Sequence, residues 1–166
     1  MSVALDFSLA AMVTGLIATL LMDIWTFARK YLMASPSLDY AMVGRWIAHM
    51  RHGRFRHVSI AEAPPMQGER IVGWVSHYVI GIVFAGLLLA VCGTGWIARP
   101  TLLPALLVGT ATLAAPFFLM QPCMGAGVAA SRTHAPCHAR LRSLVTHMIF
   151  GVGLYAGGWL THMLLY

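Results

Sequence analysis

Four ionisable side chains lie inside long apolar stretches of the sequence. They are Asp23, His77, His147 and His162. An ionisable group at membrane depth is costly, and it usually faces the interior of a helix bundle or marks a functional pathway. Carboxylate and imidazole groups can bind a divalent metal, ligate haem or relay protons. The first question is therefore whether these side chains meet at one place.

Three of the four lie at a similar distance from the end of an apolar stretch. Five to seven residues separate each from the nearest arginine: Asp23 from Arg29, His77 from Arg70, and His147 from Arg142. At the helical rise of 1.5 Å per residue, each lies roughly 8–10 Å from that margin. The sequence therefore predicts three ionisable groups at one level of a bilayer.

Small residues share the helical faces of these groups. Gly15 aligns with Asp23, Gly81 with His77, and Gly151 with His147. Gly153 and Gly157 lie four residues apart in the fourth span. Small residues mark the faces on which membrane helices approach closely. We therefore expect these glycines at helix contacts, with the ionisable groups beside them.

Several functions fit such a cluster. His77 and His147 could ligate a b-type haem, or Asp23 and both histidines could bind a divalent metal with Cys123 as a further ligand. The same residues could relay protons or ions in a small transporter or channel. They could also form an interhelical hydrogen bond that only holds the bundle together, in an accessory subunit without chemistry of its own. The residues leave these alternatives open.

Four apolar segments must position the cluster. A membrane span needs about 20 predominantly apolar residues, and only helices satisfy their own backbone groups in lipid. The expected spans are residues 7–28, 71–92, 102–120 and 144–166. The chain is 59% hydrophobic and 10% charged, with a mean hydropathy of +0.76. We predict an all-α integral membrane four-helix bundle, one transmembrane domain over residues 1–166, with a kink at Pro116.

The basic residues predict the orientation. Of the eleven Lys and Arg residues, only Arg99 falls outside the two loops that precede the second and fourth spans. Basic loops stay in the cytoplasm, so loop 29–70 is predicted to be cytoplasmic and both termini are predicted to face the periplasm or the exterior. Anionic lipid headgroups are the expected partners of these loops. Nucleic acid is not expected, because the charge lies between apolar spans rather than on a soluble basic face.

A short helix is expected in loop 29–70, over about residues 38–52, with Ser37 as its N-cap. Its apolar face carries Leu38, Met42, Trp46 and Met50, while Arg45, His49 and His52 lie largely off that face. This pattern favours an amphipathic helix in the interface, with its basic side toward anionic headgroups. The alternative is a helix that caps the cytoplasmic end of the bundle.

Other motifs are weaker. The three cysteines have no paired spacing, and the run Cys123, His134, Cys137 and His138 matches a closed zinc site poorly. No nucleophile motif, phosphate loop or dinucleotide fingerprint is present, which favours a protein without enzymatic activity. Gly153-x-x-x-Gly157 is a pattern of helix packing or dimerisation, and we expect a homo-oligomer.

The chain resembles a bacterial family of small integral membrane proteins catalogued only as a domain of unknown function. The stretches that carry the resemblance include Met22–Trp25, Asp39–Trp46, Gly73–Tyr78, Pro100–Ala105, Gln121-Pro122, Ala129–Thr133 and Arg142–Gly151. The resemblance implies a four-helix protein of the bacterial inner membrane, and it implies no activity, substrate or cofactor. The family pattern commonly has proline where this chain has His134, which weakens a metal site in that loop.

Overall fold

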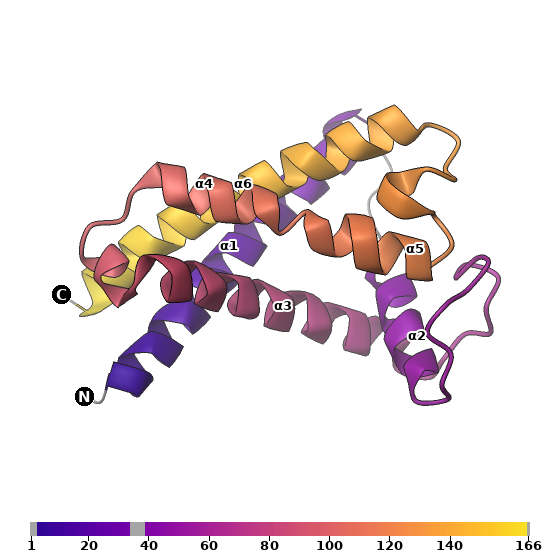
Figure 1. The fold of residues 1–166 in the computed structure, drawn as a ribbon, viewed down its shortest axis with the longest axis horizontal. Coiled ribbons are helices and arrows are strands. Elements are labelled where there is room, and N and C mark those ends of the chain that lie inside the picture. Colours follow the sequence, from indigo (N-terminus) through magenta and orange to yellow (C-terminus); the bar gives the residue numbers. More distant parts are fainter. Residues whose placement is uncertain (1–2, 34–38, 166) are drawn as a thin grey trace. The chain divides into compact units, whose positions relative to one another are not determined.

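The computed structural model describes residues 3–33 and 39–165, and the regular elements within these ranges are helices joined by turns and loops (Figure 1). The longer helices are α1 (Val3–Met33), α2 (Tyr40–Met50), α3 (Glu69–Cys92), α4 (Leu102–Ala111) and α6 (Pro136–Leu165). Shorter helical turns are η1 (Thr94–Ala98), η2 (Ala115–Met120), α5 (Gln121–Cys123) and η3 (Val128–Ala130). Within those ranges no residue forms a strand.

Four segments are long and apolar enough to cross a membrane. They are Asp6–Leu32, Glu69–Cys92, Leu102–Cys123 and Pro136–Leu164. The prediction of an all-helical chain with four such segments is therefore confirmed. Helix α6, which contains the fourth segment, begins eight residues before the predicted span of residues 144–166, because the basic residues after Pro136 belong to the same helix.

The third segment is interrupted near Pro116. Helix α4 ends at Ala111, and residues 115–120 form a π-helix in which Gln121 N–H donates to the carbonyl of Pro116. Proline has no N–H for the carbonyl four residues before it, so a regular α-helix cannot continue there. The sequence prediction of a kink at this proline matches the position of the irregular turn.

The chain forms two compact units. The first contains α1, Tyr78–Thr112, and α6 from Val145 onward. Its core consists of small and aliphatic side chains together with Trp96 and Phe150. Helix α1 runs antiparallel to α3, since Gly15 lies against Ile82 and Asp23 against Tyr78. It also runs antiparallel to α6, since Ala18 lies against Gly153 and Thr14 against Gly157.

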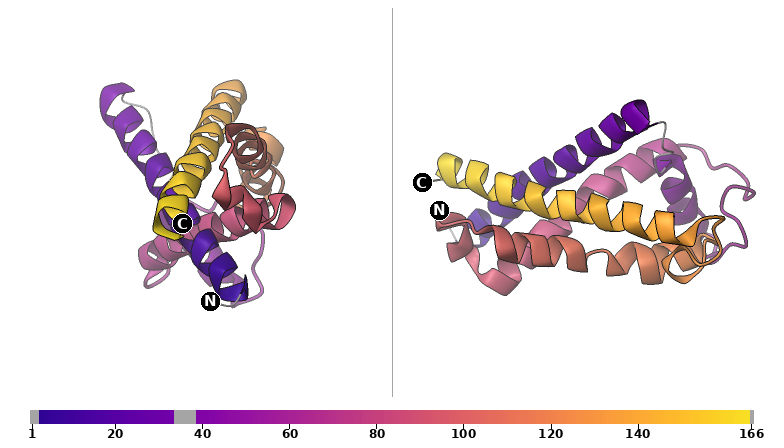
Figure 2. Two further views of the ribbon diagram at one scale, coloured as in Figure 1. Left: turned by 90° about the vertical axis from the view of Figure 1, so that its left-hand side faces the viewer. Right: turned by 90° about the horizontal axis from the view of Figure 1, so that it is seen from above.

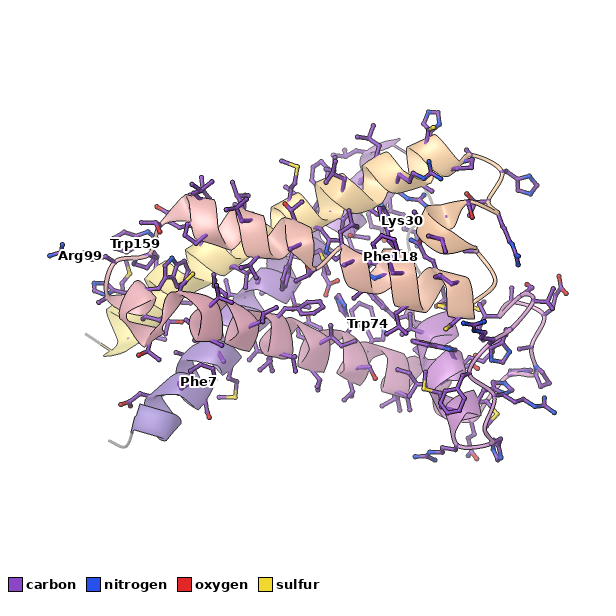
Figure 3. The ribbon with its side chains drawn as sticks, viewed as in Figure 1. Phe7, Lys30, Trp74, Arg99, Phe118 and Trp159 are labelled. Carbon is purple, nitrogen blue, oxygen red and sulfur yellow. The ribbon has the colours of Figure 1, made fainter. Side chains whose placement is uncertain are left out.

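The first turn of α1 and the last turns of α6 therefore lie at the same end of the first unit. The start of α1, the η1 turn and the last turns of α6 lie together there (Figures 1 and 2). Figure 3 places Arg99 and Trp159 at this end and Lys30 at the other. The one basic residue expected on the non-cytoplasmic side is thus far from the basic end of α1.

The second unit contains α2, the chain from Arg51 to His77, and Leu113–Leu144. Asp39 caps α2 by accepting a 2.9 Å hydrogen bond from Ala41 N–H. The expected cap, Ser37, lies outside the described residues. Helix α2 packs on the first turns of α3 so closely that a Cβ at Gly44 would overlap the carbonyl of Glu69.

Candidate functional site

Asp23 is buried in the first unit and has a hydroxyl partner. Its side chain is 4% exposed, and its Oδ2 accepts a 3.0 Å hydrogen bond from the hydroxyl of Tyr78 on α3. The contact forms because α1 and α3 approach through glycines: a Cβ added at Gly15 would lie 2.5 Å from Ile82 Cα. The prediction that Asp23 lies beside a small-residue packing face therefore matches the geometry of α1.

His147 is also paired with a hydroxyl group of the first unit. Its Nδ1 lies 2.9 Å from Thr112 Oγ1, which in turn donates its single proton to the carbonyl of Gly109 at 2.6 Å. Because that proton is already directed to Gly109, Thr112 must accept the hydrogen bond from Nδ1–H of His147. Neutral His147 is therefore the tautomer whose Nε2 carries no proton.

His77 belongs to the second unit and contacts aromatic residues. Its Nε2 lies 3.0 Å from the hydroxyl of Tyr40, and the two rings stack with centroids 4.2 Å apart. Trp74 packs on both, with its centroid 4.5 Å from that of Tyr40. Each of the three predicted ionisable residues thus has a hydroxyl group as a hydrogen-bond partner.

The remaining predicted ligand, Cys123, has a free, half-buried thiol in the second unit, and its carbonyl accepts a hydrogen bond from His57 N–H. Among residues 3–33 and 39–165, no group of three or more His, Cys, Asp or Glu side chains is arranged to hold a metal ion. The divalent metal and haem b hypotheses for Asp23, His77, His147 and Cys123 remain predictions.

The predicted packing glycines all lie at close helix contacts of the first unit. A Cβ at Gly157 would lie 2.7 Å from Thr14 O, and one at Gly153 would lie 2.7 Å from Ala18 Cα. Cβ atoms at two further glycines would meet other helices: Gly81 against Thr19 and Gly151 against Leu106. Between α1 and α6, Thr14 Oγ1 lies 3.0 Å from Thr161 Oγ1, in a buried hydrogen bond.

An ion pair in the second unit was not anticipated. Arg45 is buried and donates through Nε and Nη2 to the two carboxylate oxygens of Glu69, both at 2.8 Å, while its Nη1 lies 3.1 Å from the carbonyl of Ala63. The hydrogen bonds to Glu69 raise the pKa of Arg45 above its ordinary value. Arg45 and His49 were expected on the headgroup side of α2, and this prediction is wrong because both side chains turn inward.

Some signals for these contacts were present in the sequence. Gly44 precedes Arg45, and a glycine within a short helix often permits a close backbone approach that buries its neighbours. Tyr78 and Thr112 gave less warning, because neutral hydroxyl side chains are common in membrane helices. The pairing of Asp23 with Tyr78 depends on the register between α1 and α3, which the spacing within one helix does not define.

Comparison with known families identifies the family of this chain. Residues 12–161 match the family described as "Protein of unknown function (DUF2938)". The chain belongs to this family. The comparisons with curated proteins and with solved structures found no match. The family match thus agrees with the resemblance seen in the sequence and brings no activity with it.

Proposed function

We propose that the chain is an integral protein of a bacterial cytoplasmic membrane with four spans and both termini periplasmic. Exposed apolar residues follow one another at helical spacing along α1, a pattern typical of a face in contact with lipid. They are Met12, Leu16, Leu20, Ile24 and Phe27. The orientation is supported by the basic residues, which favour the cytoplasmic side in all loops except that of Arg99.

Fusions at the C-terminus test the orientation. A periplasmic C-terminus makes an alkaline phosphatase fusion active and leaves a GFP fusion dark, because GFP does not mature after export in an unfolded state. The reverse pair of results would overturn the proposed topology.

We further propose that the protein relays protons through its membrane segment, with Asp23 as the group that binds and releases them. The observation that supports this is a buried carboxylate, 4% exposed, hydrogen-bonded to Tyr78 within an apolar helix. A charge at the centre of a membrane helix costs about 3 kcal/mol, so such a carboxylate is usually functional. A bound proton would neutralise the Asp23 carboxylate by itself, so the relay would need no other ion to balance that charge.

The surroundings of Asp23 suit this role. Among the described residues of the first unit, the other buried polar side chains are threonines: Thr14, Thr19, Thr112 and Thr161. Hydroxyl groups both donate and accept hydrogen bonds, so they can line a route that a proton follows. Thr19 lies one helical turn from Asp23 on α1, and Thr14 lies further along the helix toward the end that carries Arg99.

Reconstitution into liposomes loaded with a pH-sensitive dye tests the relay. Under a potassium diffusion potential, the wild-type protein should acidify the lumen faster than protein-free liposomes do. Asp23→Asn should reduce the flux to the protein-free level, since the amide does not titrate. The matched control is Asp6→Asn, which removes a carboxylate from the first turn of the same helix and should leave the flux unchanged. Equal flux in wild type and Asp23→Asn, or no flux in wild type, would refute the relay.

A second candidate function is binding of haem or a divalent metal through His147. It is supported by the hydrogen bond from Nδ1 to Thr112, because the tautomer so defined has its lone pair on Nε2, the atom that would ligate. An absorption spectrum and a metal analysis of protein in mild detergent decide this. A Soret band or stoichiometric metal that disappears in His147→Ala would support it, and the absence of both signals would exclude it.

A further inference from the structure

The segment after α2 presents exposed apolar side chains among exposed arginines. Phe55 is 57% exposed and Val58 is 92% exposed. The side chains of Arg51, Arg54 and Arg56 around them are also exposed. A soluble loop rarely combines bulky apolar groups with several cations, whereas a surface that binds anionic lipid does so regularly.

The backbone of this segment is held in place by the second unit. Trp46 donates a 2.9 Å hydrogen bond from Nε1 to the carbonyl of Phe55, and His57 N–H donates at 2.8 Å to the carbonyl of Cys123. Two separate parts of the unit, α2 and the end of α5, therefore fix residues on either side of Arg56. Because these hydrogen bonds fix the backbone, the side chains of Phe55 and Arg56 point away from the second unit and are exposed.

The segment is also tied to the margin of a membrane-length helix. A Cβ at Gly73 of α3 would overlap the carbonyl of Tyr40, so α2 crosses α3 at this glycine. Gly73 lies four residues after the start of α3, roughly 6 Å along the helix axis. A loop fastened to α2 is therefore within reach of the headgroup region of a bilayer that α3 crosses.

The charge of the segment selects the kind of lipid. The connection between α2 and α3, residues 51–68, contains three exposed arginines and one exposed acidic residue, Glu62. We propose that residues 51–58 form a lipid-binding loop, in which Arg54 and Arg56 contact anionic phospholipid headgroups and Phe55 and Val58 insert into the interface. The loop depends on the proposed membrane location and is independent of the Asp23 relay.

A fluorescent label at Val58, the highly exposed last residue of the loop, tests the proposal. Val58→Cys is prepared with the three natural cysteines changed to serine, labelled with an environment-sensitive dye, and placed in nanodiscs. In discs containing phosphatidylglycerol, emission should shift to the blue and quenching by neutral acrylamide should slow, relative to discs of phosphatidylcholine alone. Equal emission and quenching in the two lipids would overturn the proposal.

Charge-neutral variants identify the residues responsible. Arg54→Gln with Arg56→Gln should lower the equilibrium constant for insertion about 25-fold, equivalent to about 2 kcal/mol at about 1 kcal/mol per arginine. Arg99→Gln removes one charge from the exposed arginine that lies outside the two basic loops and should leave insertion unchanged, whereas Arg54→Gln alone should weaken it. Insertion weakened equally by these two single substitutions would show a general charge effect and refute the loop assignment. Unchanged thermal melting verifies that each variant is folded.

Discussion

The two units are held together by different chemistry. In the first unit, helices meet through glycine, alanine and threonine, and the polar contacts between helices each involve a hydroxyl group, such as that between Thr14 and Thr161. In the second unit, a charged pair of Arg45 and Glu69 fastens α2 and its following loop to α3. Where lipid surrounds a helix, a charge is costly and close packing gives the attraction. A buried charged pair is tolerated when hydrogen bonds satisfy its donors and acceptors, as those of Arg45 do.

The largest effect is expected from removal of Arg45. Arg45→Met leaves the Glu69 carboxylate without its cation and frees loop carbonyls, so we expect a loss of about 3 kcal/mol in stability. Glu69→Leu added to Arg45→Met should restore part of this loss, because the unpaired charge disappears. Melting in mild detergent measures the double-mutant cycle. Additive losses would mean that the two side chains are not coupled.

Overpacking of the helix contacts tests the first unit. Gly157→Val places a branched side chain against the backbone of Thr14 and should cost about 2 kcal/mol, typical of an overfilled contact. Gly95→Ala is the matched control, because a Cβ there meets no atom within 4 Å. Melting temperatures of the two variants give the comparison, and an unperturbed Gly157→Val protein would show that α1 and α6 do not pack here.

The hydroxyl pair should contribute much less than the ion pair. Thr14→Val and Thr161→Val each remove one partner of the hydrogen bond between α1 and α6. Hydrogen bonds between membrane helices average about 0.6 kcal/mol, so the coupling energy of the two substitutions should be of that size. A coupling above about 2 kcal/mol, the size of a strong charged contact, would remove the contrast between the units.

The smallest effect is a pH dependence in the second unit. Burial, with smaller contributions from the charges of His49 and Arg54, lowers the pKa of His57 below its usual value of 6.5. The unfolded chain therefore binds a proton more readily, so stability should fall as the pH drops below about 6.5 and should level off above it. His57→Gln should flatten this part of the profile. A wild-type protein that gains stability on acidification would contradict the assignment.

The sequence was informative where one helix alone determines the answer. Apolar length located the four segments, and Pro116 located the irregular turn of the third. The small-residue faces were also visible, because glycine spacing is a property of a single helix. The inward turn of Arg45 was missed because amphipathic spacing shows two faces of α2 without showing which one meets α3. The partners of Asp23 and His147 were missed for a related reason, since they depend on the register between helices.

The close approaches also determine how this chain can tolerate genetic change. A Cβ at Gly157 meets main-chain atoms of Thr14, and no substitution at position 14 can remove a carbonyl oxygen. A Cβ at Gly81 meets the Thr19 hydroxyl first, which Thr19→Ala deletes. A selection for restored folding should therefore find second-site suppressors of Gly81→Ala at position 19. Variants with a side chain at position 157 should regain folding only by reversion to glycine.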